Sequence, residues 1–130
     1  MKNKKKVFID GEAGTTGLHI YQRLETRHDI ELIQLDSRER KDRIARKKAL
    51  NDADIAILCL PDSAAIEAVK LAEGSETVII DASSAHRVAR GWTYGFTEYK
   101  PEQRKAIKES KRITNPGCYA IGAISLLYPL

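Results

Sequence analysis

A cysteine stands where a short motif could make it a nucleophile. Cys118 comes directly after the turn-forming pair Pro116-Gly117, and an apolar segment typical of a helix follows it. A thiol at the N-terminal end of a helix meets the positive end of the helix dipole, which favours the nucleophilic thiolate. A free cysteine is also often packed as a small hydrophobic residue. Position alone leaves both interpretations open for Cys118, whereas Cys59, between two leucines of a predicted strand, fits the packed one.

Three glycines near the N-terminus have a spacing that suits a nucleotide. Gly11, Gly14 and Gly17 form a G-x-x-G-x-x-G pattern between a predicted strand and a predicted helix. Glycines permit a tight turn and let the backbone approach a pyrophosphate, which accepts hydrogen bonds from the helix N-terminus. Thr15 and Thr16 add hydroxyl donors. The pattern predicts a dinucleotide site; the alternative is a plain tight turn, which needs fewer glycines.

The residues after the second predicted strand would meet the adenosine ribose. There the sequence reads Asp36-Ser37-Arg38. An acidic residue at this place suits the free 2′-hydroxyl of NAD, whereas an arginine accommodates the 2′-phosphate of NADP. The guanidinium of Arg38 matches phosphate geometry and Ser37 adds a donor, so we predict NADP as the cofactor.

Basic residues are concentrated around this place. Residues 38–48 contain seven basic and two acidic side chains, a net charge of +5 in a chain of net charge +4. Such an excess suits a phosphorylated ligand or a nucleic acid. Most of these side chains also fit a solvated helix face, and Arg38 is the exception that we assign to the cofactor.

Size and composition indicate one soluble domain. The chain has 130 residues, of which 42% are hydrophobic and 31% charged. It contains neither a signal-peptide pattern nor an apolar run near the ~18–20 residues that span a bilayer, so we expect no membrane partner and a cytoplasmic location. Two cysteines at unrelated positions predict no disulfide framework, and three histidines without ligand spacing predict no metal site.

Short apolar runs alternate with helical patterns along the chain. Strands are predicted at residues 6–10, 30–35, 54–60 and 77–81, and helices at 15–26, 42–51 and 63–73, with Ser63 as an N-cap. A loop at 90–99, a helix at 101–110, a short strand at 112–115, a turn at 116–118 and a helix at 119–128 follow. The alternation predicts an α/β fold, a Rossmann-type doubly wound parallel sheet with helices on both faces.

The carboxyl ends of parallel strands meet at one edge of a sheet, where ligands bind. Gly11, Asp36, Pro61 and Ser83 each follow a predicted strand, so the candidate site residues converge there. The chain stops near the end of its last helix without a capping glycine or a polar tail. We therefore expect a second domain to be missing from it.

Four segments together resemble one superfamily. Residues 11–17 (GEAGTTG) resemble the glycine turn of the N-acetyl-γ-glutamyl-phosphate reductase and aspartate-semialdehyde dehydrogenase superfamily, and 81–87 (DASSAHR) resemble the segment where its serines lie near the nicotinamide. Residues 115–119 (NPGCY) resemble the nucleophile motif in the form that N-acetyl-γ-glutamyl-phosphate reductases carry, since aspartate-semialdehyde dehydrogenases have asparagine before the cysteine. Residues 94–98 (YGFTE) resemble a further stretch of the reductase, with Phe96 and Thr97 replacing Leu and Pro. The segment between the glycine turn and Cys118 is compact, which is similar to the shorter of the reductase's two subtypes.

The resemblance implies an activity. It implies NADPH-dependent reductive dephosphorylation of N-acetyl-γ-glutamyl phosphate to the semialdehyde, in arginine biosynthesis, through a thioester on Cys118. Asn115 would help to orient the substrate and Arg87 would bind its carboxylate or phosphate, unless Arg87 forms a structural ion pair. The general acid–base would be a histidine of the second domain, a role that His86 does not take. The implied cofactor-binding residues are Gly11, Gly14, Thr15, Thr16, Gly17, Ser37, Arg38, Pro61, Ser83 and Ser84.

The resemblance also implies a division of the chain. Residues 1–115 would form the NAD(P)-binding domain and 116–130 the start of the catalytic domain. A chain ending at Leu130 would bind nucleotide without turnover, and the complete enzyme would be a homo-oligomer because of the apolar face left open.

Other functions remain open at this point. One is aspartate-semialdehyde dehydrogenase or a related acyl-phosphate reductase, which shares cofactor and nucleophile. Another is a nucleotide-sensing or nucleic-acid-binding module that uses residues 38–48; it predicts binding that falls steeply with salt and an unreactive Cys118. We favour a small acyl-phosphate substrate over nucleic acid, because aromatic residues are few. A third is an inactive Rossmann-type domain that serves in assembly.

Overall fold

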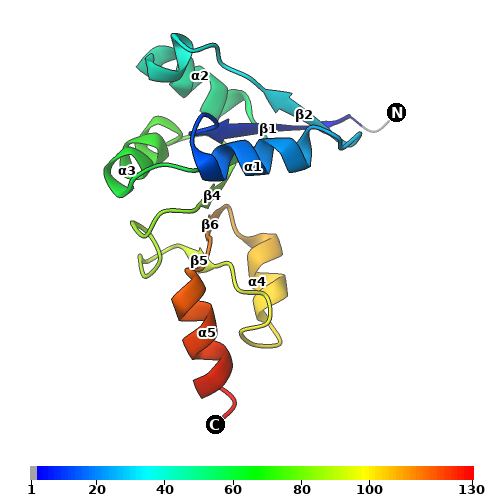
Figure 1. Ribbon diagram of the computed structural model, residues 1–130, viewed down its shortest axis with the longest axis vertical. Coiled ribbons are helices and arrows are strands. Elements are labelled where there is room, and N and C mark those ends of the chain that lie inside the picture. Colours follow the sequence, from blue (N-terminus) through cyan, green and yellow to red (C-terminus); the bar gives the residue numbers. More distant parts are fainter. Residues whose placement is uncertain (1–2) are drawn as a thin grey trace.

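The computed structural model describes residues 3–130, which form one parallel sheet with helices around it (Figure 1). The strands lie side by side in the order β2-β1-β3-β4-β6-β5, and every pairing is parallel. Their bounds are β1 Lys5–Asp10, β2 Ile30–Ile33, β3 Ile55–Leu58, β4 Val78–Asp81, β5 Thr93–Tyr94 and β6 Arg112–Thr114. The helices are α1 Thr15–Leu24, the 3-10 helix η1 Glu39–Lys41, α2 Arg43–Asp52, α3 Asp62–Leu71, α4 Gln103–Glu109 and α5 Cys118–Leu127. The predicted α/β class and parallel sheet are confirmed.

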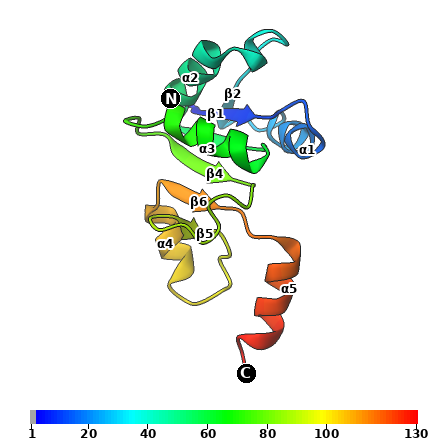
Figure 2. The same ribbon diagram turned by 90° about the vertical axis from the view of Figure 1, so that its left-hand side faces the viewer.

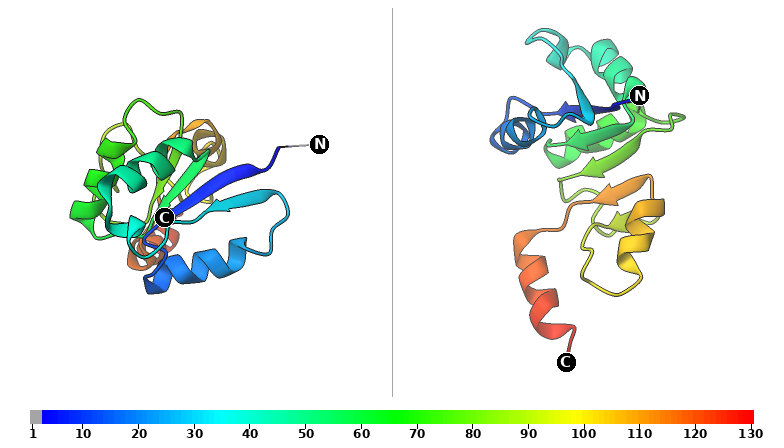
Figure 3. Two further views of the ribbon diagram at one scale, coloured as in Figure 1. Left: turned by 90° about the horizontal axis from the view of Figure 1, so that it is seen from above. Right: turned by 90° about the vertical axis from the view of Figure 1, so that its right-hand side faces the viewer.

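The helices cover both faces of the sheet. Seen from above, α1 lies on one side of the strands, and α2 and α3 lie on the other (Figure 3). This follows from right-handed crossovers, because the chain moves outward from β1 to β2 and then back across the sheet to β3 and β4. The carboxyl ends of the strands consequently face one way, toward the side on which α5 begins (Figure 2).

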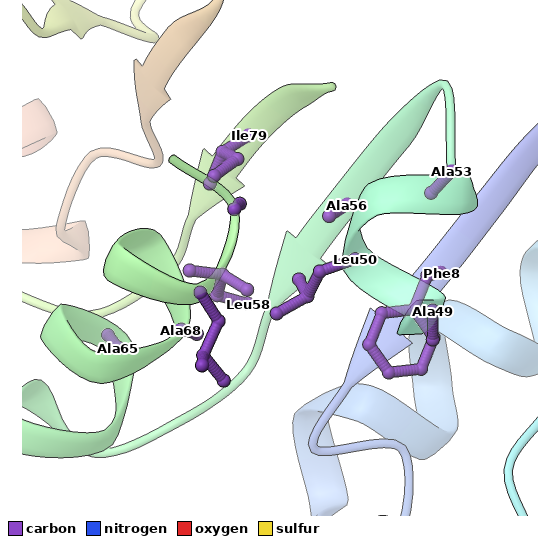
Figure 4. Close-up of a cluster of buried hydrophobic side chains, with 11 residues drawn as sticks. Phe8, Ala49, Leu50, Ala53, Ala56, Leu58, Ala65, Ala68 and Ile79 are labelled. Carbon is purple, nitrogen blue, oxygen red and sulfur yellow. The ribbon is translucent and has the colours of Figure 1, made fainter. Parts of the chain in front are cut away.

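The core lies between the sheet and the helix pair α2 and α3. Small side chains let these helices approach closely, and Leu50, Leu58, Phe8 and Ile79 fill the space between them (Figure 4). Each of these four large side chains is at most 2% exposed. Full burial of such a side chain contributes about 1.5–3 kcal/mol, so this half of the molecule holds most of the hydrophobic stabilisation. The alanines of the cluster are Ala49, Ala53, Ala56, Ala65, Ala68 and Ala72.

The structure corrects three local predictions. Helix α3 begins at Asp62, with Pro61 at the N-cap position and no side-chain cap, so Ser63 is not the N-cap. The predicted loop at 90–99 contains β5, which is too short for an alternating pattern to reveal and is stabilised by pairing with β6. Strand β3 ends at Leu58, and Cys59 therefore lies just beyond the strand, half-buried, and not in its middle.

Helix α5 differs from the other helices. Its sequence, CYAIGAISLL, is almost wholly apolar, yet none of its residues is buried by the described part of the chain. The helix extends away from the sheet (Figures 1 and 2). Within residues 3–130, no helix is long and apolar enough to cross a membrane.

Candidate nucleotide and thiol site

The glycine turn between β1 and α1 is shaped by close backbone contacts. Gly11 has a φ of 96°, which disfavours other residues, and a Cβ there would lie 2.3 Å from the carbonyl oxygen of Cys59. A Cβ on Gly17 would lie 2.2 Å from the carbonyl oxygen of Gly11. The same oxygen accepts a 3.0 Å hydrogen bond from the Gly14 amide. The turn therefore folds back upon itself, and only glycine fits at both of its ends.

This turn leaves the N-terminus of α1 available to a ligand. Gly14 is the N-cap residue and offers no side-chain cap, and Thr15 and Thr16 are exposed in the first turn. The first backbone N–H groups of a helix have no partner within the helix and attract anions. The helix N-terminus, approached by a turn without bulky side chains, is thus suited to the pyrophosphate of a dinucleotide.

A cleft of about 370 Å³ opens beside the turn. Its walls come from the glycine turn, from the chain after β2 and from the chain after β3. The apolar residues Leu35, Leu60 and Ala64 form one part of its lining, and the cations Arg40, Lys41 and Arg46 form another. An apolar slot with nearby cations suits a planar base joined to a phosphorylated ribose.

Two carboxylates, of Asp10 and Asp36, already accept hydrogen bonds from polar groups around the cleft. Arg46 donates from Nε and Nη2 to the buried carboxylate of Asp10, with Nη2 and Oδ2 2.8 Å apart. Asp36 accepts hydrogen bonds from the amides of Arg38 and Glu39, both at 2.8 Å, and so shapes the turn after β2. Ser37 and Arg38 are exposed on that turn and do not line the cleft.

Asp81 organises the segment after β4. Its buried carboxylate accepts from the amide and hydroxyl of Ser83, at 2.9 and 2.8 Å, and lies 2.6 Å from Nδ1 of His86. The His86 ring stacks on Trp92 with 4.2 Å between the ring centres. The carbonyl oxygen of Asp81 accepts from the amide of Asn115 at 2.8 Å. One residue therefore joins the serine segment to the chain that leads to Cys118.

Ser84 ties the same segment to α3. Its amide and hydroxyl donate to the two carboxylate oxygens of Asp62, at 2.9 and 2.6 Å. These hydrogen bonds hold the pKa of Asp62 below its usual value. Pro61 precedes Asp62 and is exposed at this edge. The chain after β3 and the chain after β4 are thereby held together.

The two thiols lie in different surroundings. Cys118 is exposed and is the first residue of α5. Arg87 lies against the turn before it, because a Cβ on Gly117 would be 3.0 Å from Nη1 of Arg87. Burial, with Asp10 and Asp81 nearby, raises the pKa of Cys59 to about 11, which keeps that thiol protonated at neutral pH.

Comparison with known proteins agrees with this geometry. Residues 41–107, just over half of the chain, match the family described as the semialdehyde dehydrogenase NAD-binding domain. The chain belongs to this family. It is therefore an α/β domain that binds a nicotinamide nucleotide.

Individual relatives show which kind of enzyme the chain is similar to in sequence. The chain is 55% identical over 128 residues to N-acetyl-γ-glutamyl-phosphate reductase 2 of Nostoc sp. and 56% identical over 127 residues to the N-acetyl-γ-glutamyl-phosphate reductase of Mesorhizobium japonicum. These alignments cover 98% of this chain but 40% and 41% of the relatives. The chain thus spans about two fifths of the length of the curated relatives that it matches.

Solved structures support the fold. Aspartate semialdehyde dehydrogenase II of Vibrio cholerae superposes with a TM-score of 0.71 at 19% identity, over 98% of this chain and 46% of that one. The corresponding enzyme of Francisella tularensis gives 0.61 at 21% identity, over 85% and 35%. At this level of identity the likeness concerns the arrangement of strands and helices.

The structure of this semialdehyde dehydrogenase family member brings most predicted site residues to one edge. The glycine turn, Pro61, Ser83 and Ser84 follow β1, β3 and β4, and Asn115 follows β6. Arg87 lies beside the Cys118 turn. Ser37 and Arg38 lie apart from the cleft lining. The cofactor and substrate roles of all these residues stay predictions.

Sequence reasoning missed several residues that shape the site. Asp81 and His86 lie in a segment that the family resemblance singled out, but their pairing depends on how the chain turns after β4. Asp62 could have been suspected from its place directly after Pro61 at a strand end. Arg40 fits the solvated helix face that the basic stretch predicts, because charge spacing does not show which side chain of a turn lines a cleft.

Proposed function

We propose that this chain is the nucleotide-binding part of an N-acetyl-γ-glutamyl-phosphate reductase that uses NADPH. The observation that carries the proposal is the exposed Cys118 at the start of α5, with the Arg87 guanidinium against its turn, on the edge that also holds the glycine turn. The identity of 52–57% to curated reductases of that name supports the same substrate.

The thiol and the arginine have separate tasks in this chemistry. Cys118 attacks the acyl carbon of the substrate as a thiolate, a C–S bond forms, the bond to the phosphate oxygen breaks, and inorganic phosphate leaves. Arg87 holds the phosphate or the carboxylate of the substrate. Its Nε is buried without a hydrogen-bond partner among residues 3–130, and such an atom favours an anionic ligand. Asn115 orients the substrate next to the nucleophile.

The cofactor is held by the edge of the sheet. The N-terminus of α1 binds the pyrophosphate, with Gly11, Gly14, Gly17, Thr15 and Thr16 around it. Ser83 and Ser84 would bind the nicotinamide side of the cofactor, together with Pro61, which precedes the Asp62 that holds Ser84. Bound NADPH supplies the hydride that converts the thioester to the aldehyde and releases the thiolate. The cations around the adenosine side favour NADP over NAD.

The remaining parts of the proposal concern the whole enzyme. Residues 116–130 begin the catalytic part, whose other portions lie outside this chain. The apolar surface of α5, with Leu126 76% exposed, is suited to burial within an oligomer of the enzyme. We expect a cytoplasmic protein that acts on a small acyl phosphate and does not bind nucleic acid.

The proposal is tested in the reverse direction, with the sequence produced within an enzyme of the length of its relatives. NADPH formation from NADP⁺, phosphate and N-acetylglutamate semialdehyde is followed by the absorbance of the reduced cofactor. Cys118→Ser should lower the rate about a thousandfold or more, because a hydroxyl replaces the nucleophile. Lys70→Ala, which truncates an exposed side chain near the end of α3, serves as the control and should keep the rate.

Two results would contradict the proposal. One is a Cys118→Ser enzyme that retains most of its activity while binding substrate normally. The other is a wild-type enzyme that turns over aspartate semialdehyde faster than the N-acetylated substrate, which would indicate another acyl-phosphate reductase.

A further inference from the structure

The turn after β2 contains several cationic side chains. Some of them line the cleft and others do not. Arg40 and Lys41 line the cleft beside the glycine turn. Arg38, two residues earlier, begins η1 as its N-cap residue, and its exposed side chain is not part of that lining. Neighbouring charges in the sequence therefore have different access to a ligand in the cleft.

The acidic residue of the turn has a structural task. Asp36 Oδ1 accepts from the amides of Arg38 and Glu39, and the Asp36 amide donates to the Glu39 carboxylate at 3.0 Å. This reciprocal arrangement resembles a capping box and fixes the direction of η1. A carboxylate engaged in this way is less available to the 2′-hydroxyl of an adenosine ribose, which is the group that would select NAD.

Arg40 is held at the cleft by partners on two sides. Its Nε donates to the carbonyl oxygen of Leu35 at 3.1 Å, and its Nη2 lies 3.7 Å from Glu12 of the glycine turn. This contact with Glu12 is long and the Arg40 side chain is 41% exposed, so the guanidinium can still bind an anion in the cleft. Arg46, by contrast, is committed to the buried Asp10 carboxylate.

The position of Arg40 matches what an adenosine phosphate needs. The apolar residues Leu35 and Leu60 line the same cleft and offer a slot for an adenine ring. A ribose between that slot and the N-terminus of α1 would present its 2′-position toward the chain after β2. The guanidinium of Arg40 and the ammonium of Lys41 are the cations on that wall.

We propose that Arg40, and not Arg38, is the residue that selects NADP over NAD, by binding the 2′-phosphate with Lys41 beside it. The inference rests on the proposed function, since it assumes that the cleft takes the adenosine half of a nicotinamide cofactor. It assigns the discrimination mainly to one side chain of the basic stretch. Apart from Lys41, the other basic residues of 38–48 bind protein carboxylates or are exposed outside the cleft lining.

The experiment titrates the chain and its Arg40→Ala and Arg38→Ala variants with NADPH and with NADH. Arg40→Ala should weaken NADPH binding about tenfold or more and leave NADH binding within about twofold, because only NADPH carries the 2′-phosphate. Arg38→Ala removes the same charge two residues away and should change both affinities less than about threefold at 150 mM salt. Arg40→Lys should fall between wild type and Arg40→Ala, since it keeps the charge and loses the planar fork.

The NADH affinity shows whether the turn remains folded in each variant. A selective loss of NADPH binding in Arg38→Ala, with Arg40→Ala unaffected, would overturn the assignment. Equal losses of both cofactors in Arg40→Ala and in Arg40→Lys would also overturn it, because Arg40 would then only shape the turn. If the wild-type chain bound neither cofactor, the proposed nucleotide site would fail, and that result differs from each of the others.

Discussion

Two turns at the same edge of the sheet lead into ten-residue helices, and they are held in different ways. The turn before α1 is packed by backbone, since a Cβ on Gly17 would lie 2.2 Å from a carbonyl oxygen. The turn before α5 meets a side chain, since a Cβ on Gly117 would lie 3.0 Å from the end of Arg87. The first turn is thus packed against backbone, and the second is packed against the end of a flexible side chain.

The two thiols near these turns also differ, in how far they are exposed. Cys59 lies under the first turn, where its carbonyl oxygen contacts Gly11, and burial raises the pKa of its thiol. Cys118 lies at the second turn, exposed at the start of a helix. The comparison teaches that the turn packed against backbone suits a cofactor held in one pose, whereas the turn packed against a flexible side chain suits a residue that must form and break bonds.

Alanine at each turn should give the largest difference. Gly17→Ala places a methyl group against backbone that cannot move, so the free energy of unfolding should fall by about 3 kcal/mol, despite the better helix propensity of alanine. Gly117→Ala should cost less than about 1 kcal/mol, because Arg87 can shift its flexible end. Urea denaturation followed by circular dichroism measures both variants.

Gly122→Ala serves as a reference for this pair, since nothing lies within 4 Å of the Cβ position at Gly122. Equal destabilisation by Gly17→Ala and Gly117→Ala would remove the contrast between a backbone-packed and an arginine-packed turn. In the complete enzyme, Gly117→Ala should still lower activity, because displacement of Arg87 reaches the proposed substrate site.

Thiol labelling compares the two cysteines directly. At pH 7.5 a thiol with a pKa of about 11 is ionised in roughly three molecules in ten thousand, so iodoacetamide should modify Cys59 very slowly. Cys118 should be labelled first, as peptide mass spectrometry after short exposures would show. The labelling rate of Cys59 should rise with pH until about pH 11, provided that the chain stays folded. Labelling of Cys59 before Cys118 at neutral pH would contradict the assigned surroundings.

The smallest expected effect is on stability in acid, and it comes from the contact between Asp62, after β3, and Ser84, after β4. Hydrogen bonds from Ser84 lower the pKa of Asp62 in the folded chain, so this carboxylate stabilises the fold above its unfolded pKa of about 3.9. That contribution is lost as the pH falls through the lower folded pKa. Ser84→Ala should raise the pKa of Asp62, as carboxyl-detected NMR titration would show, and should make stability less sensitive to acid.

Ser63→Ala is a suitable control, because Ser63 is exposed in the first turn of α3 and is not the N-cap. An unchanged Asp62 pKa in Ser84→Ala would show that Ser84 does not stabilise the ionised carboxylate.

The alternation of strands and helices could be predicted because both elements have a strong period in this chain. Buried strands such as VIID and glycine-rich turns stand out against polar helices. Strand β5 could not be found this way, since two residues show no period and their pairing with β6 comes from residues about twenty positions away. The predicted N-cap of α3 is wrong because Ser63 has the favoured residue type, while the backbone starts the helix at Asp62.

The amino-acid sequence by itself determined the glycine turn, the strand–helix order and the placement of Cys118 at a helix start, because these depend on short-range backbone geometry and on hydrophobic period. Only the tertiary structure decided which cation enters the cleft, that Asp81 joins the serine segment to Asn115, and that α3 buries Ala65, Ala68 and Leu71 against the core. Those outcomes depend on which elements meet in space, and a side chain's direction from a turn is set by contacts that spacing along the chain does not encode.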